Sequence, residues 1–186
     1  MKAVLDACVL YPTVMREVLL AVAAEGLFRP LWSARILEEW ARAAAKLGPG
    51  GEAQARGEIA LLRARWPEAE LRPAPGVEAR LWLPDAADVH VLATAIAGSA
   101  DVIVTSNAAD FPRGLLAEEG LRREDPDAFL RALWQDHPDT VARAAETVRA
   151  EAERLSGERW DIRRLLKKAR LPRLGKALAG QVPRQG

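Results

Sequence analysis

Cysteine and histidine are scarce in this sequence. Its 186 residues include one cysteine, Cys8, and two histidines. A single cysteine cannot form an internal disulfide, which excludes the disulfide-stabilised secreted scaffolds. This cysteine usage is typical of a reducing compartment, so we expect a cytoplasmic protein.

The sequence also lacks a strong net charge and a long apolar run. The net charge of +1 predicts no global attraction to nucleic acid, so binding of that kind would need a local basic patch. A basic-then-apolar targeting segment is absent from the amino terminus, and no apolar stretch is long enough to span a bilayer. We therefore expect no membrane association.

An apolar content of 49% supports a real core, and its distribution predicts an α/β protein. Strands are expected at 2–5, 27–32 (an edge, because Pro30 interrupts it), 79–83 and 102–104. Helices are expected at 13–26, 33–46 and 52–66, with a further helix opened by Asp85 and Asp88. Strands alternating with helices predict a three-layer α/β/α sandwich with a short central parallel sheet. Beyond residue 121 strand signals vanish, so residues 1–124 are predicted as this domain and 125–186 as a helical C-terminal extension.

Acidic residues stand at the junctions of the expected elements. Asp6 follows the first strand, Asp85 and Asp88 open a helix that is apolar on nearly all sides, and Asp110 follows the strand 102–104. Taken singly, each is explained by local structure: Asp6 could cap the next turn, and Asp85 with Asp88 has capping-box spacing. Asn107-x-x-Asp110 repeats that spacing.

The helix predicted at 33–46 offers two glutamates, and helical phase separates them. At about 100° per residue, Glu39 borders the inward stripe defined by Ile36 and Trp40, whereas Glu38 points away from it. Glu39 can therefore reach the crevice at the end of the sheet, where open α/β sheets place their active sites.

Taken together, these carboxylates favour a site over separate caps. Asp6, Glu39, Asp88 and Asp110 would repel one another strongly unless a cation joined them, and a hard divalent ion is the usual solution. Oxygen ligands without a His or Cys cluster favour Mg²⁺ or Mn²⁺ over zinc. His90 is expected to be a core histidine with satisfied hydrogen bonds, and Cys8 a small buried hydrophobe.

The residues that carry a family resemblance are Asp6, Ser33-x-x-Ile-Leu-x-Glu39, Pro84-Asp85-x-x-Asp88-x-His90-Val-Leu-Ala-x-Ala95 and Val104-Thr-Ser-Asn107-x-x-Asp110-Phe-Pro112. In this order, over about the first 120 residues, they resemble the PIN-domain family, in its bacterial branch that includes VapC-like toxins. The resemblance implies a Mg²⁺-dependent (or Mn²⁺-dependent), single-strand-specific endoribonuclease that uses metal-activated water. It assigns the catalytic and metal-binding roles to Asp6, Glu39, Asp88 and Asp110, with Thr105, Asn107 and Asp85 in support.

The resemblance also implies partners: an RNA substrate, the antitoxin protein of a type II toxin–antitoxin pair, and a second copy in a homodimer. Two other functions stay open. The domain could be a non-catalytic module that binds RNA or protein, or, less favoured, a phosphohydrolase with Asp6 as nucleophile. The latter usually carries a second aspartate two residues on, where this chain has Cys8.

Basic residues gather near the carboxyl terminus. Arg163, Arg164, Lys167 and Lys168 alternate with apolar residues and predict an amphipathic basic helix. Three interpretations remain open: a solvated face of a docked helix, a grip on RNA phosphates, or a contact with an acidic partner.

Overall fold

The structure is a computed structural model and describes residues 1–180. Residues 181–186, the end of the expected C-terminal extension, lie outside this range. Contacts divide the chain into two compact units: unit 1 is Met1–Tyr11 with Phe28–Glu124, and unit 2 is Pro12–Leu27 with Asp125–Gly186. Residues 12–27 thus group with the C-terminal helices, although the sequence places them in the first domain. A functional boundary after residue 124 stays a prediction.

Unit 1 is built on a parallel sheet of five strands, in the order β3-β2-β1-β4-β5. The strands are β1 (Lys2–Leu5), β2 (Arg29–Ser33), β3 (Glu70–Leu71), β4 (Val102–Val104) and β5 (Arg122–Glu124). Its helices are α1 (Ala7–Leu10), α3 (Ala34–Ala44), α4 (Gly51–Arg65), α5 (Pro75–Glu78), α6 (Val89–Ala97) and α7 (Arg113–Glu118), with short 3-10 turns η1 (Ala45–Leu47) and η2 (Ala86–Asp88). The predicted α/β fold with a short central parallel sheet, followed by C-terminal helices, is confirmed.

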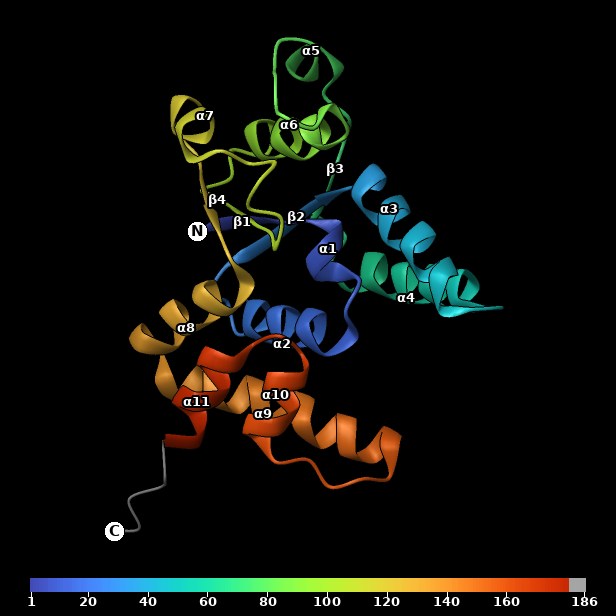
Figure 1. Ribbon diagram of the computed structural model, residues 1–186, viewed down its shortest axis with the longest axis vertical. Helices are drawn as coiled ribbons and strands as arrows, with labels where there is room; N and C mark the ends of the chain where they lie inside the picture. The colour runs from blue at the N-terminus through green and yellow to red at the C-terminus, as the bar shows by residue number, and fades with distance from the viewer. Residues whose placement is uncertain (181–186) are drawn as a thin grey trace. The chain divides into compact units, whose positions relative to one another are not determined.

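The core of unit 1 lies where β1 and β4 meet α6. Every residue of β4 is fully buried, and residues 89–95 of α6 are buried on all sides. A helix that is apolar all round must be covered on several faces, and α6 packs against β1, β2 and β4 (Figure 1). Each fully buried Val or Leu contributes roughly 1.5–3 kcal/mol relative to an exposed one, so this packing fixes the start of α6 against the sheet.

Three predicted details of unit 1 are wrong. β2 is not an edge strand, because β1 and β3 pair with its two sides. Residues 79–83 form no strand, and the polar loop before them contains β3 and α5 instead. A strand, β5, does follow residue 121, and it pairs with β4.

In the described part of unit 2, every regular element is a helix. Its helices are α2 (Thr13–Ala24), α8 (Pro126–Asp136), α9 (Pro138–Ser156), α10 (Ile162–Lys168) and α11 (Pro172–Gly180). Asp125 caps α8 by accepting hydrogen bonds from two backbone N–H groups, with Pro126 at the first helical position. Buried Asp127 then accepts from the N–H groups of Arg173 and Leu174, which joins α8 to the start of α11.

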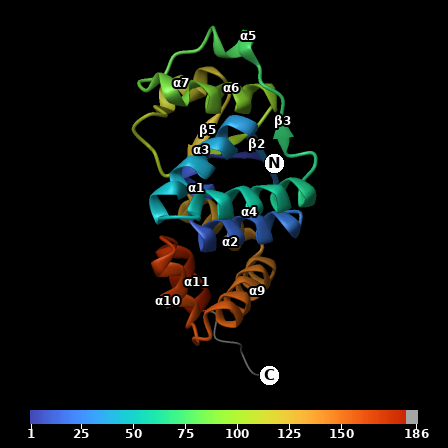
Figure 2. The same ribbon diagram turned by 90° about the vertical axis from the view of Figure 1, so that its right-hand side faces the viewer.

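Figures 1 and 2 show α10 and α11 side by side, and α2 packs along α9. None of the helices within residues 1–180 combines the length and the apolar character needed to cross a bilayer.

Candidate metal centre

The candidate site begins where the order of the strands reverses. The chain runs outward from β1 to β2 and β3, and then returns to place β4 on the other side of β1. Leu5 and Val104, the last residues of β1 and β4, are partners in the register, so Asp6 and Thr105 leave the sheet side by side. Open α/β sheets bind their ligands at such reversal points, beyond the carboxyl ends of the parallel strands.

Asp6 is held by side chains from the neighbouring strand end and from its own turn. Its carboxylate is almost fully buried, and Oδ2 accepts hydrogen bonds from Thr105 Oγ1 at 2.7 Å and from Cys8 Sγ at 3.1 Å. Asp6 precedes α1 but makes no side-chain capping bond to it. The capping alternative for Asp6 is therefore not what the structure has.

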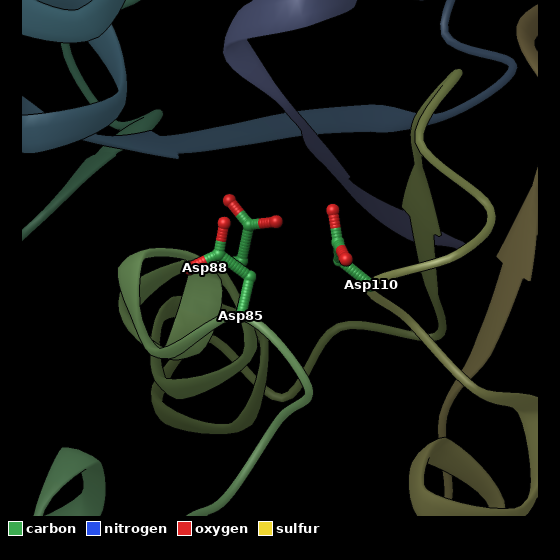
Figure 3. Close-up of side chains that lie close together, drawn as sticks. All are labelled: Asp85, Asp88 and Asp110. Carbon is green, nitrogen blue, oxygen red and sulfur yellow. The ribbon is translucent and has the colours of Figure 1, made fainter.

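Three other carboxylates converge beside this pair. Asp85, Asp88 and Asp110 each offer an oxygen, and these oxygens lie within 4.8 Å of one another. Figure 3 shows Asp85 and Asp88 entering from the start of α6 and Asp110 from the loop after β4. Among residues 1–180, no Lys or Arg forms an ion pair with any of the three.

Capping explains one member of this group and not the others. Asp85 Oδ1 accepts a 2.8 Å hydrogen bond from Ala87 N and so caps the turn η2. Asp88 makes no capping bond; its Oδ2 accepts from Asn107 Nδ2 at 3.2 Å. The same amide also donates to Asp110 Oδ2, so Asn107 bridges two carboxylates that come from different elements.

Electrostatic crowding is concentrated on Asp88. Loss of solvation raises its pKa from 3.8 to about 6, and repulsion from Asp6, Asp110, Asp85 and Glu39 adds to the rise, in that order. Each of these charges disfavours the ionised form of Asp88, and a bound cation would reverse the effect. The oxygen-only donors and this uncompensated charge fit a hard divalent cation.

The two glutamates of α3 lie in different surroundings. Glu39 Oε1 is 2.8 Å from His90 Nε2 of α6 and 3.5 Å from Arg35 Nε. Glu38 pairs with Arg42 and with Arg56 of α4. Glu39 therefore faces the candidate site and Glu38 faces α4.

Of the predicted site residues, Asp85, Asp88 and Asp110 form the tight group. Asp6 and Glu39 stand at its margin, close enough to act electrostatically on Asp88. Thr105 and Asn107 contact these carboxylates directly. The role of each residue in catalysis or metal binding stays a prediction.

Three neighbours of the site were missed. Arg35 contacts Glu39, and its Nη2 donates to the Ala87 carbonyl at 3.2 Å; its position four residues before Glu39 is the signal in the sequence. His90 is buried as expected, but its approach to Glu39 is not aligned as a hydrogen bond, and neither ring nitrogen has a hydrogen-bond partner within residues 1–180. The expectation that His90 is a core histidine with satisfied hydrogen bonds is therefore wrong. Leaving a buried polar group without a partner costs about 1–3 kcal/mol.

Cys8, the third, is exposed overall rather than buried, but its Sγ lies against Asp6 and Thr105. Desolvation at that position, with repulsion from Asp6, raises the pKa of the Cys8 thiol to about 12. Without a bound cation, Cys8 therefore remains a neutral thiol near pH 7 and donates a hydrogen bond to Asp6.

The basic residues of α10 lie in unit 2. Arg164 and Lys168 stand over the Trp160 ring, 5.5 Å and 4.9 Å from its centroid. Arg163 and Lys167 are exposed and have no acidic partner in the described part of the chain. RNA binding by these four residues stays a prediction.

Comparison with known families identifies the fold independently. A family model described as PIN domain matches residues 2–109, which is more than half of the chain. The matched range contains Asp6, Glu39, Asp85 and Asp88 and ends one residue before Asp110. No curated protein and no solved structure matches the chain. With its sheet order, its cluster of acidic residues and this match, the chain belongs to the PIN-domain family.

Proposed function

We propose that this protein is a divalent-metal-dependent, single-strand-specific endoribonuclease and the toxin of a type II toxin–antitoxin pair, in the VapC-like branch. The observation that carries the proposal is the convergence of Asp85, Asp88 and Asp110, none of which pairs with a Lys or Arg among residues 1–180. A PIN domain is a nuclease fold, and this cluster could hold a metal ion. Mg²⁺ or Mn²⁺ suits its oxygen ligands.

The chain's own residues hold and orient the groups that react. Asp85, Asp88 and Asp110 supply the clustered carboxylate oxygens, and Asp6 and Glu39 lie close enough to act electrostatically on Asp88. Asn107 fixes Asp88 relative to Asp110, and Thr105 fixes Asp6. A divalent ion bound there would activate water, orient the scissile phosphate and stabilise the leaving 3′-oxygen, so that the product carries a 5′-phosphate.

Cleavage of single-stranded RNA tests this proposal. We expect cleavage in Mg²⁺ or Mn²⁺, none in excess chelator, and none by Asp88→Asn with metal. Asp136→Asn, at an exposed position of α8, is the matched control and should cleave like the parent. Cleavage that persists in chelator and in Asp88→Asn would overturn the metal mechanism. RNA binding without cleavage would favour the non-catalytic module.

The finer assignments have tests of their own. We propose an antitoxin protein as partner, which co-purification with the product of the adjacent reading frame would test, and a homodimer, which sedimentation would test. Cytoplasmic action follows from the single cysteine and is open to fractionation.

A further inference from the structure

His90 is the least satisfied polar group of unit 1. It is 4% exposed, and both ring nitrogens lack a hydrogen-bond partner among the described residues. Nε2 nevertheless lies 2.8 Å from Glu39 Oε1, so a small rotation of the glutamate carboxylate would complete a hydrogen bond. Arg35 approaches the same oxygen from the solvent side, at 3.5 Å, and is half exposed.

We propose that His90 is a positioning residue for Glu39. Its Nε2–H group donates to Oε1 once the carboxylate has rotated into line and so fixes Glu39, which leaves Oε2 for a metal ion. This inference rests on the proposed function, because it gives Glu39 a metal to bind. Carboxylate ligands are commonly held by such outer hydrogen bonds, and their loss typically weakens metal affinity 10–100-fold.

Two substitutions at His90 distinguish the role of its Nε2–H group as a hydrogen-bond donor from the role of its ring in packing. The amide nitrogen of glutamine reaches the position of Nε2, whereas that of asparagine reaches only the position of Nδ1. Calorimetric titration with Mn²⁺ should therefore show affinity reduced at least tenfold in His90→Asn and within about threefold of the parent in His90→Gln. In a Glu39→Gln background, adding His90→Asn should change nothing further.

The outcomes are distinct. Equal losses in both His90 variants, or a loss that persists in the Glu39→Gln background, would make His90 a packing residue and overturn the inference. A parent protein that binds no Mn²⁺ would overturn the proposed function as well. If His90→Asn does not fold, the test rests on His90→Gln. A Mn²⁺ affinity of His90→Gln more than tenfold below that of the parent would contradict the donor role.

A second inference comes from a cavity of about 540 Å³ in unit 2, independent of the acidic site. It lies between α8 and α11 and is lined by Arg131, Trp134, Arg173, Lys176, Ala177 and Gly180. The side chains of its three cations form no ion pair with any residue in 1–180 and are exposed. By contrast, Arg149 and Arg154 of α9 are paired with glutamates.

We infer that this basic pocket binds the backbone of single-stranded RNA. Three cations that form no ion pair within residues 1–180 supply the contacts that phosphates need, and neutralising the phosphates releases the counterions bound to the RNA. Trp134, which is partly exposed, also lines the pocket, and aromatic rings are the side chains on which bases of a single strand stack. The inference deepens the proposed function by naming where the RNA strand is held, and it is tested by binding alone.

Fluorescence anisotropy with a labelled single-stranded RNA, in chelator so that no cleavage occurs, measures this binding. Neutralising Arg131 and Arg173 by glutamine should weaken binding at least tenfold. It should also reduce the steepness of log affinity against log salt concentration by about 1.4. Trp134→Leu should weaken binding and leave that slope unchanged. The control replaces Arg143 and Arg154, which are paired with Glu25 and Glu151, by glutamine.

Equal effects of the pocket pair and the control pair would overturn the pocket and leave the nuclease proposal standing. So would an unchanged salt slope in the pocket pair. Binding of an acidic peptide in preference to RNA, with RNA unaffected by the pocket variants, would assign the pocket to a protein partner and equally contradict the inference.

Discussion

Thr105 Oγ1 donates a 2.7 Å hydrogen bond to Asp6 Oδ2, joining the ends of two neighbouring strands inside the candidate site. Both side chains are almost fully buried. Thr105 Oγ1 also accepts from Asn107 N at 3.0 Å, so one hydroxyl links the carboxylate of β1 to the loop after β4.

Thr105→Val should remove this link with little change in shape. Asp6 would keep Cys8 as a donor and lose its shorter hydrogen bond, so we expect metal-free unfolding to become easier by about 1–3 kcal/mol. Urea denaturation in chelator measures the change, with Thr105→Ser as the control that keeps the hydroxyl. An unchanged midpoint in Thr105→Val would contradict a structural role for this bond.

The raised pKa of Asp88 predicts a pH dependence of stability without metal. Its folded pKa of about 6 exceeds the ordinary 3.8, so between these values the native state binds more protons than the unfolded state. The contribution of Asp88 is therefore full below about pH 4 and is lost as pH rises through 6. We expect a loss of about 1 kcal/mol, since partial exposure screens a shift that would otherwise be worth about 3.

Asp88→Asn removes this titration. The variant should match the parent near pH 4 and become the more stable protein by pH 7, in melts carried out in chelator. Asp136→Asn should follow the parent throughout. A variant that is less stable than the parent at pH 7 would mean that Asp88 is structural.

Asp85 combines a capping bond with a place in the cluster, and two substitutions separate these roles. Asparagine keeps an acceptor for Ala87 N, so Asp85→Asn should be as stable as the parent in chelator, while Asp85→Ala should lose about 1 kcal/mol. Mg²⁺ should stabilise both variants less than the parent, because both lack the charge. Thermal melts with and without Mg²⁺ distinguish the two roles. If Mg²⁺ stabilised Asp85→Asn as much as the parent, Asp85 would act only as a helix cap.

The two glutamates of α3 should respond differently. Glu39→Gln removes a charge that faces Asp88, and we expect RNA cleavage to fall on the order of 100-fold. Glu38→Gln should leave cleavage near the parental rate, since Glu38 pairs with Arg42 and Arg56 away from the site. Initial rates under identical Mg²⁺ compare the two. Greater sensitivity at Glu38 would show that Glu39 is not the functional residue.

Sequence patterns predicted the elements that are apolar and buried. Val102–Val104 and the helix after Asp88 have an uninterrupted apolar character that only a covered position explains. β5 was missed because Arg122–Glu124 is charged throughout, and only its pairing with β4 makes it a strand. Pairing partners of that kind are not readable from local composition.

Pro30 explains why the prediction that β2 is an edge strand is wrong. Proline cannot donate to a sheet, which favours an edge. Trp32 N donates to Ala69 O on the β3 side, and by alternation the nitrogen of Pro30 faces the same side. β3 pairs only with Trp32 and Ser33, so Pro30 lies beyond its end and no donor is needed there.

The candidate site was predictable to the extent that it follows strand ends. Asp6 and Asp110 were placed by their positions after β1 and β4. The closeness of His90 to Glu39 was not predictable, because it depends on how α6 and α3 approach each other in space. Helical periodicity predicts which face of a helix is buried. It does not predict which residue of another helix lies against that face.

The grouping of α2 with the C-terminal helices has a consequence for synthesis on the ribosome. α2 buries Val18, Leu19 and Val22, and it packs along α9. Because α9 begins about 110 residues later, at roughly 5–20 residues per second this apolar face waits on the order of 6–20 seconds for its partner. During that interval the nascent chain presents an uncovered amphipathic helix, which is the kind of surface that chaperones bind.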